Sequence, residues 1–164
     1  MLIDTKELLS DAQALTATAI STNVYDTLPS GGSINAGDTG GPTANTTTNF
    51  GAGRPLYLYI LVTTAMVSAG SATLTIALES DDNTSLSSAT SHQTIVTAVT
   101  AATMVAGYWL AKGIVIPQGS YQRYVGLRYT TNTSDFETGN ISAWLSDIPY
   151  SDEQYEAGSL TGVN

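Results

Sequence analysis

The side chains that could carry out chemistry are few in this sequence. His92 is the single histidine, cysteine is absent, and the paired acids are Asp81 with Asp82 and Asp135 with Glu137. One imidazole without further His or Cys ligands cannot build a zinc site, and the alternating pattern of a calcium loop is missing. Most proton transfer and nucleophilic catalysis uses groups that are scarce here. We therefore expect no enzyme, no metal and no cofactor, with His92 at the surface and the acids in solvated turns.

The charge balance limits the partners. Fourteen acidic residues face five basic ones, the net charge is −9 and the isoelectric point is near 4.1. Nucleic acids and anionic membranes attract basic proteins, so we expect neither as a direct partner. The longest apolar run, 56–62, is far too short to span a membrane, and the first residues lack the apolar stretch of a secretion signal. The acidic surface either keeps the protein soluble or meets a basic protein surface.

Apolar residues recur at every second position, as in strands that bury one face. Residues 72–80 place apolar side chains on one face and polar ones on the other, namely Leu74, Ile76 and Leu78 opposite Thr73, Thr75 and Glu79. Residues 56–66 instead carry apolar side chains on both faces. The clearest strands are expected at 56–66, 72–80, 121–130 and 140–147, with weaker signals at 14–25, 92–99, 105–110 and 114–116. Strands without alternating helices predict an all-β fold, a single-domain β-sandwich or jelly roll.

Four segments connect or flank these strands. We expect the last two clear strands to pair through the polar loop 131–139. The Gly/Thr-rich stretch 30–53 is either a surface loop or an arm that orders against a neighbouring subunit. Residues 1–13 are expected to form an extended N-terminal arm, and 151–164 an acidic tail.

Aromatic residues are too numerous for one small core. They either fill that core and pair across strands or contribute to an oligomer interface, where Tyr and Trp are enriched. The outward members by strand parity are Tyr57, Tyr59, Tyr124 and Trp144, and Arg128 lies on the same face as Tyr124. These five are the candidate interface residues.

Several short motifs resemble one known family. They are MLID at 1–4, SDAQA at 10–14, TATA at 16–19, STNV at 21–24, PLYL at 55–58, VTTA at 62–65, RYVGLRY at 123–129 and SAWL at 142–145. Together they resemble the Bbp16-type capsid cement proteins of tailed bacteriophages. Residues 31–50 look like an insertion relative to that pattern.

The resemblance implies a jelly-roll protein that decorates the outside of an icosahedral capsid. Such a protein is made in the host bacterial cytoplasm, bridges neighbouring capsomers of the major capsid protein and stabilises the DNA-filled head of the virion. It would act as a homo-oligomer, a homodimer or alternatively a homotrimer. Asp4, Lys6 and Asp11 in the arm are further candidate contacts. The main alternative is a carbohydrate-binding module that stacks sugars on exposed aromatic rings.

Overall fold

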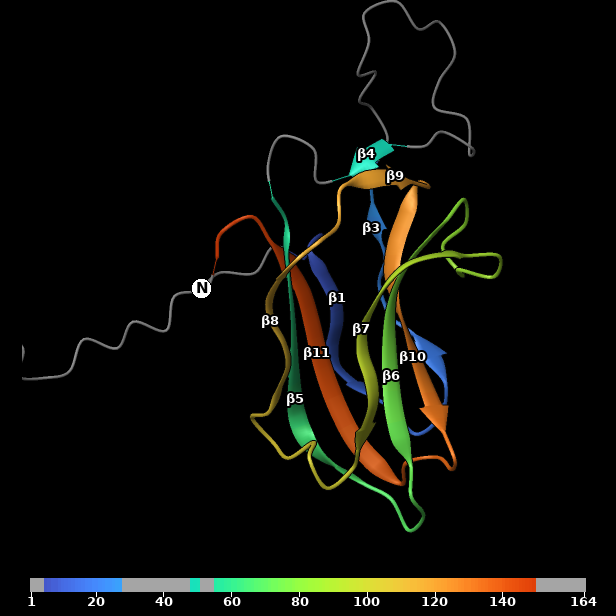
Figure 1. Cartoon of the computed structure of the whole chain (residues 1–164), viewed down its shortest axis with the longest axis vertical. Coiled ribbons are helices and arrows are strands. Elements are labelled where there is room, and N and C mark those ends of the chain that lie inside the picture. The colour runs from blue at the N-terminus through green and yellow to red at the C-terminus, as the bar shows by residue number, and fades with distance from the viewer. Residues whose placement is uncertain (1–4, 28–47, 51–54, 150–164) are drawn as a thin grey trace, which may run out of the picture.

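A computed structural model of the chain describes residues 5–27, 48–50 and 55–149. The elements are β1 (Leu8–Ala14), β2 (Ala19–Ile20), β3 (Tyr25–Asp26), β4 (Thr48–Phe50), β5 (Tyr57–Val67), β6 (Thr73–Asp81), β7 (Thr90–Thr100), β8 (Trp109–Val115), β9 (Gly119–Tyr121), β10 (Tyr124–Asn132) and β11 (Thr138–Ser146) (Figure 1). No helix occurs in these residues, which confirms the all-β expectation. Accordingly, no helix in the described part of the chain is long and apolar enough to cross a membrane.

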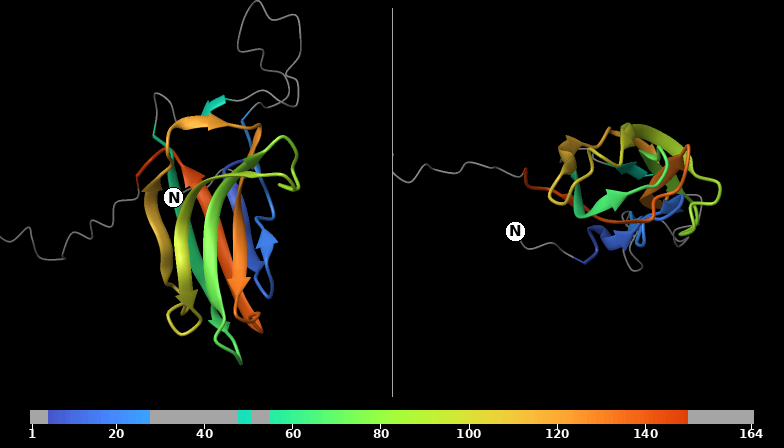
Figure 2. Two further views of the ribbon diagram at one scale, coloured as in Figure 1. Left: turned by 45° about the vertical axis from the view of Figure 1, so that its right-hand side comes forward. Right: turned by 90° about the horizontal axis from the view of Figure 1, so that it is seen from below.

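The strands form two antiparallel layers. One sheet has the order β1-β11-β5-β8 and the other β2-β10-β6-β7, with β3 also pairing with β10. The first strands pair with the last and the middle strands pair with each other: β1 with β11, β2 and β3 with β10, β5 with β8, and β6 with β7. The chain therefore follows the path of one long hairpin wrapped around a core. This is the winding of a jelly roll. The layers face one another in the view from below, and the side view shows the ribbon of β4 and β9 across one end (Figure 2).

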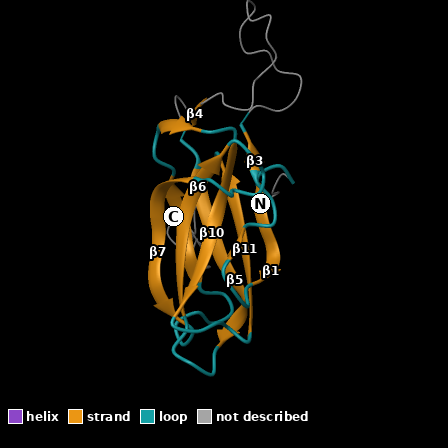
Figure 3. Ribbon diagram, turned by 90° about the vertical axis from the view of Figure 1, so that its right-hand side faces the viewer, coloured by secondary structure: helices purple, strands orange, loops and turns teal. Residues whose placement is uncertain are grey.

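The expected hairpin between residues 121–130 and 140–147 is wrong. Strand β10 lies between β2 and β6, whereas β11 lies between β1 and β5 in the opposite sheet. The connection between them carries Phe136, which is buried at 3% exposure and belongs to the core. A polar loop thus carries the chain from one layer to the other. Figure 3 shows most such connections at the two ends of the strands.

The N-terminal prediction also needs correction. Residues 8–13 do not form an arm, because Leu8–Ala14 is the edge strand β1 against β11. A bulge interrupts the pairing at Ala12, which has φ 43°, and Asn140 and Ser142 of β11 hydrogen-bond to its carbonyl and amide. The strand expected at 14–25 is instead a turn with the short strands β2 and β3. A short, polar, bulged strand lacks the alternation that sequence patterns detect.

Other expectations fall on different boundaries or outside the described residues. The weak strands at 105–110 and 114–116 are replaced by one strand, β8. Within the stretch 30–53, only β4 is described, and it pairs with β9. Asp4, the rest of that stretch and the tail 151–164 lie outside the described residues.

The core fills the space between the two sheets. It includes Leu58, Ile60 and Val62 of β5, Leu74, Ile76 and Leu78 of β6, and Ile141, Ala143 and Leu145 of β11. Fully burying one such aliphatic side chain contributes about 1.5–3 kcal/mol. These strands form where alternate residues supply that apolar face, which explains why the clearest patterns were located correctly.

One buried hydrogen bond joins the two sheets through the core. Tyr129 of β10 and Ser10 of β1 are both fully buried, and their hydroxyl oxygens lie 2.8 Å apart. Ser10 donates its proton to Gln13 Oε1 at 2.7 Å, so Tyr129 donates to Ser10. Burial raises the pKa of Tyr129. The hydroxyl therefore stays protonated and crosslinks the layers.

Candidate interface

The candidate interface residues are divided between the two sheets. Tyr57, Tyr59 and Trp144 lie on β5 and β11 of the first sheet, whereas Tyr124 and Arg128 lie on β10 of the second. No single flat surface therefore unites all five. Lys6 and Asp11 are both exposed; Lys6 lies in the turn before the edge strand β1, and Asp11 lies within that strand.

Three aromatic rings gather on the outer face of the first sheet, and we name them the aromatic cluster. Tyr59 and Trp144 are direct partners in the β5–β11 register and stack with centroids 5.6 Å apart at 13°. Trp109 of β8 meets both rings edge-on, at 6.3 Å from Tyr59 and 5.8 Å from Trp144. Gly113 makes room for Tyr59, because a Cβ there would lie 3.2 Å from the Tyr59 hydroxyl. These rings point away from the core between the sheets.

Two of these rings are not exposed, contrary to the expectation. Tyr59 has no exposed surface, and Trp144 retains 6%. Their strand neighbours Leu58, Ile60 and Ala143 belong to the core cluster, while Tyr59 and Trp144 do not. Strand parity predicted the outward direction correctly, but an outward direction did not mean exposure. Tyr57 and Tyr124 are half-buried.

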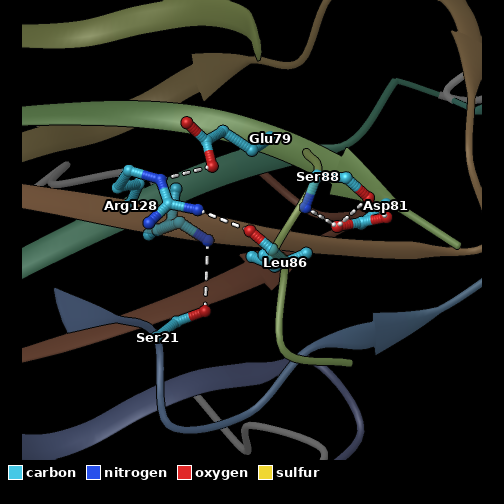
Figure 4. Close-up of polar contacts among 7 residues, drawn as sticks. Ser21, Glu79, Asp81, Leu86, Ser88 and Arg128 are labelled. Atoms are coloured by element: carbon cyan, nitrogen blue, oxygen red, sulfur yellow. Dashed lines mark hydrogen bonds and ion pairs between the residues drawn. The ribbon is translucent and has the colours of Figure 1, made fainter. Parts of the chain in front are cut away.

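Arg128 has an intramolecular role that its sequence position did not reveal. Its Nε donates to Glu79 Oε2 at 2.7 Å, and its Nη2 donates to the main-chain oxygen of Leu86 at 2.6 Å (Figure 4). Glu79 lies on the neighbouring strand β6, and Leu86 lies in the loop 82–89 between β6 and β7. We name Arg128, Glu79 and the Leu86 carbonyl the Arg128 clamp. It fixes the middle of the loop to the outer face of the second sheet.

Asp81 fixes the ends of the same loop. Its carboxylate is fully buried and accepts hydrogen bonds from the Asp82 amide at 2.7 Å. It also accepts bonds from the Ser88 amide at 2.7 Å and the Ser88 hydroxyl at 3.1 Å (Figure 4). Burial would raise the pKa of Asp81, but the hydrogen bonds from Ser88 and Asp82 together lower it. The expectation of a solvated turn acid at Asp81 is therefore wrong, because the loop closes over the carboxylate.

Leu86 supplies the apolar contact that holds the loop down. It is fully buried, has φ 47°, and sits over Gly126 of β10. A Cβ at Gly126 would lie 2.9 Å from both Leu86 Cδ1 and Ser21 Oγ. Ser21 in turn accepts the Leu127 amide at 3.1 Å. The missing side chain at Gly126 is what allows the loop and the segment before β3 to approach the sheet.

His92 is not a free surface residue. Its ring stacks on Tyr121 with centroids 3.8 Å apart, and its Nε2 lies 2.7 Å from the hydroxyl of the buried Ser80. Burial lowers the pKa of His92. Among residues 5–27, 48–50 and 55–149, no group of three or more His, Cys, Asp or Glu side chains could hold a metal ion.

Comparison with known proteins identifies the family. The family model described as Bbp16 matches residues 9–145. This chain belongs to the Bbp16 family. No curated protein sequence matches it significantly.

The Bbp16 match coincides with the folded unit. It begins within β1 and ends one residue before the end of β11, so it covers both sheets of the jelly roll. The aromatic cluster, the Arg128 clamp and the His92–Tyr121 pair all lie inside the matched region.

Proposed function

We propose that this chain is a structural capsid cement protein of a tailed bacteriophage. In this role it binds the exterior of the icosahedral shell, contacts the major capsid protein and bridges adjacent capsomers of the virion. It is made in the host bacterial cytoplasm and joins the shell there. In this role the protein acts by binding and has no enzymatic activity.

The observation that supports this proposal most is the Bbp16 match across the complete jelly roll. Of the sequence motifs that resemble cement proteins, 55–58 leads into β5 and 123–129 forms much of β10. The fold is a double sheet whose two layers are joined by a buried hydrogen bond between Ser10 and Tyr129. Such a crosslinked body suits a protein that must transmit force between capsomers.

Several linked copies of the protein would strengthen its attachment to the shell. A homodimer or homotrimer of this chain would present the same contacts two or three times, and closed symmetry is the common form of such assemblies. Linked contacts raise avidity well above the affinity of each. Modest contact areas on each copy are therefore sufficient for firm crosslinking of the shell.

The sugar-binding alternative receives less support from the geometry. A stacking platform needs exposed ring faces, yet Tyr59 and Trp144 are buried. Tyr57 and Tyr124 are half-buried and lie on opposite sheets. These rings therefore offer no common platform for one glycan chain.

Cosedimentation with capsids tests the proposal. Purified protein would be added to phage shells that lack it, and the pellet and a cryo-electron microscopy map would be examined. We expect saturable binding and added density on the outer surface, with bound shells surviving higher temperature than bare ones. Absence of the protein from virions, together with no binding to shells before or after expansion, would refute the proposal.

A further inference from the structure

Three exposed apolar side chains lie at the end of the sandwich where β5 finishes. Val67 is the last residue of β5, and Val105 and Tyr108 lie in the loop between β7 and β8. The Met66 amide donates to the Met104 carbonyl at 2.9 Å, which holds this loop beside β5. The Tyr108 amide donates to the Val105 carbonyl at 3.0 Å, which brings these two residues together in one turn. In Figure 1 the loop runs along the bottom of the sandwich.

Two carboxylates share this end of the molecule. Asp135 and Glu137 are exposed and lie in the connection between β10 and β11. The Glu137 amide donates to the Val67 carbonyl at 2.8 Å, so the backbone of this acid lies beside the apolar residue. The Thr131 hydroxyl donates to Asp135 Oδ1 at 2.9 Å and orients that carboxylate. We name Val67, Val105, Tyr108, Asp135 and Glu137 the apolar–acidic end.

Buried side chains fix both segments that carry these residues. Met104 of the first loop is fully buried, and Phe136 lies between the two acids with its ring in the core. The exposed groups are therefore held in place before any partner arrives. A surface that is ordered in advance loses little conformational entropy on binding.

Ion pairs within the described part of the chain leave these carboxylates out. Neither Asp135 nor Glu137 pairs with a base, whereas Arg123 pairs with Asp26 at 2.9 Å. Arg128 is held by the clamp to Glu79. Both arginines thus have carboxylate partners elsewhere in the fold.

The described lysines lie toward the opposite end of the first sheet. Lys112 is opposite Tyr59 in the β5–β8 register, and Lys6 precedes β1, which begins opposite Trp144, the partner of Tyr59. Tyr59 and Val67 are eight residues apart on β5, which is about 26 Å in a strand. Surface charges are largely screened beyond about 8 Å at physiological salt. The apolar–acidic end therefore keeps its negative charge.

We propose that the apolar–acidic end docks on a basic surface of the shell protein that also presents an apolar side chain. The inference rests on the proposed function and adds the contacting region and the chemistry of its partner. Lysine or arginine of the shell would meet the two carboxylates, while the apolar side chain would cover Val67, Val105 and Tyr108. Such charge complementarity favours fast and specific association.

The same charges disfavour other occupants of this end. Nucleic acids and anionic lipids carry negative charge and would be repelled. A second copy that paired symmetrically through this end would bring the same acids together, and like charges facing each other weaken an interface. A basic partner satisfies both the acids and the exposed apolar groups.

The first test removes an apolar contact. Val105→Ser is compared with Val115→Ser, because the two valines are 54% and 53% exposed and Val115 lies at the far end of β8. Binding to phage shells that lack the protein would be measured by cosedimentation. Central contacts dominate interface energies, so we expect Val105→Ser to raise the Kd about tenfold and Val115→Ser to leave it unchanged. Equal Kd values for the two variants would overturn the inference.

The second test reverses a charge. Glu137→Lys is compared with Asp82→Lys in the loop between β6 and β7, at the other end of the sandwich. We expect Glu137→Lys to raise the Kd about tenfold or more and Asp82→Lys to leave it unchanged. The wild-type Kd should also rise between about 50 and 300 mM salt, because salt screens the attraction. Binding by the wild type that does not depend on salt would overturn the inference, as would equal effects of the two reversals.

Control measurements separate the possible causes of weak binding. All variants should melt as the wild type does; if a lysine variant melts lower, Glu137→Gln and Asp82→Asn replace that pair. Sedimentation should give Val105→Ser the same mass as the wild type, and dissociation of an oligomer would overturn the inference because this end would then join copies of the chain. If the wild type binds no shells, the proposed function fails. If it binds and the variants at the apolar–acidic end bind equally well, only this inference fails.

Discussion

Tyr59 and Trp144 face each other across β5 and β11 with their rings nearly parallel, on the side of the sheet that points away from the core. The outer face of a two-layer sandwich is usually polar. Here it carries a second apolar cluster, completed by Trp109. The first sheet is therefore stabilised on both sides, which accounts for the apolar residues on both faces of β5.

We expect this ring pair to contribute measurably to stability. In a double-mutant cycle of Tyr59→Leu and Trp144→Leu, the coupling energy should be about 0.5–1.5 kcal/mol, as for other aromatic pairs. The measurement is urea unfolding of the four proteins. Tyr59→Leu combined with Tyr129→Leu is the control cycle, because Tyr129 lies in the other sheet. Additive free energies in the first cycle would mean that the rings do not interact.

Alanine substitutions at two glycines distinguish the cost of a steric clash from the cost of backbone strain. Gly139 has φ 142°, and a Cβ there would overlap Met66, whereas Gly107 has φ 86° with nothing within 4 Å. Gly139→Ala should lower the free energy of unfolding by about 2–4 kcal/mol, since overpacking adds to the strain. Gly107→Ala should cost only about 1 kcal/mol, from the left-handed backbone alone. Equal losses in chemical denaturation would contradict the predicted clash at Met66.

The Arg128 clamp should be a cooperative unit. Arg128→Met removes the bonds to Glu79 and to the Leu86 carbonyl and leaves Glu79, at 8% exposure, without its countercharge. Hydrogen bonds to charged groups contribute about 1.5–3 kcal/mol, and we expect a loss of that size. Glu79→Leu combined with Arg128→Met should cost less than the sum of the single changes, because no buried charge is then left unpaired. If the losses of unfolding free energy in the two single variants add up to the loss in the double variant, the two side chains act independently.

Some of these features were predictable and others were not. Strands β5, β6 and β11 each place core residues at every second position, so local pattern located them. The assignment of β10 and β11 to different sheets depends on long-range winding, which a short polar loop around Phe136 does not encode. The burial of Leu86 was equally hidden, since it depends on Gly126, which lies far away in the sequence. Parity predicts where a side chain points, but only tertiary contacts decide whether it is exposed.

His92 should make stability depend on pH above the range of the carboxylates. Burial lowers the pKa of His92 from its ordinary value of 6.5, so the unfolded chain binds this proton more readily than the folded one. The stability that neutral His92 contributes is fully present above pH 6.5 and is lost as the pH falls through the pKa of His92 in the folded protein. The melting temperature of the wild type should therefore decrease on acidification in this window. The melting temperature of the His92→Gln variant should remain nearly constant in this window, because the chain contains no other histidine. Parallel profiles for the two proteins would show that protonation of His92 does not disturb its contacts with Ser80 and Tyr121.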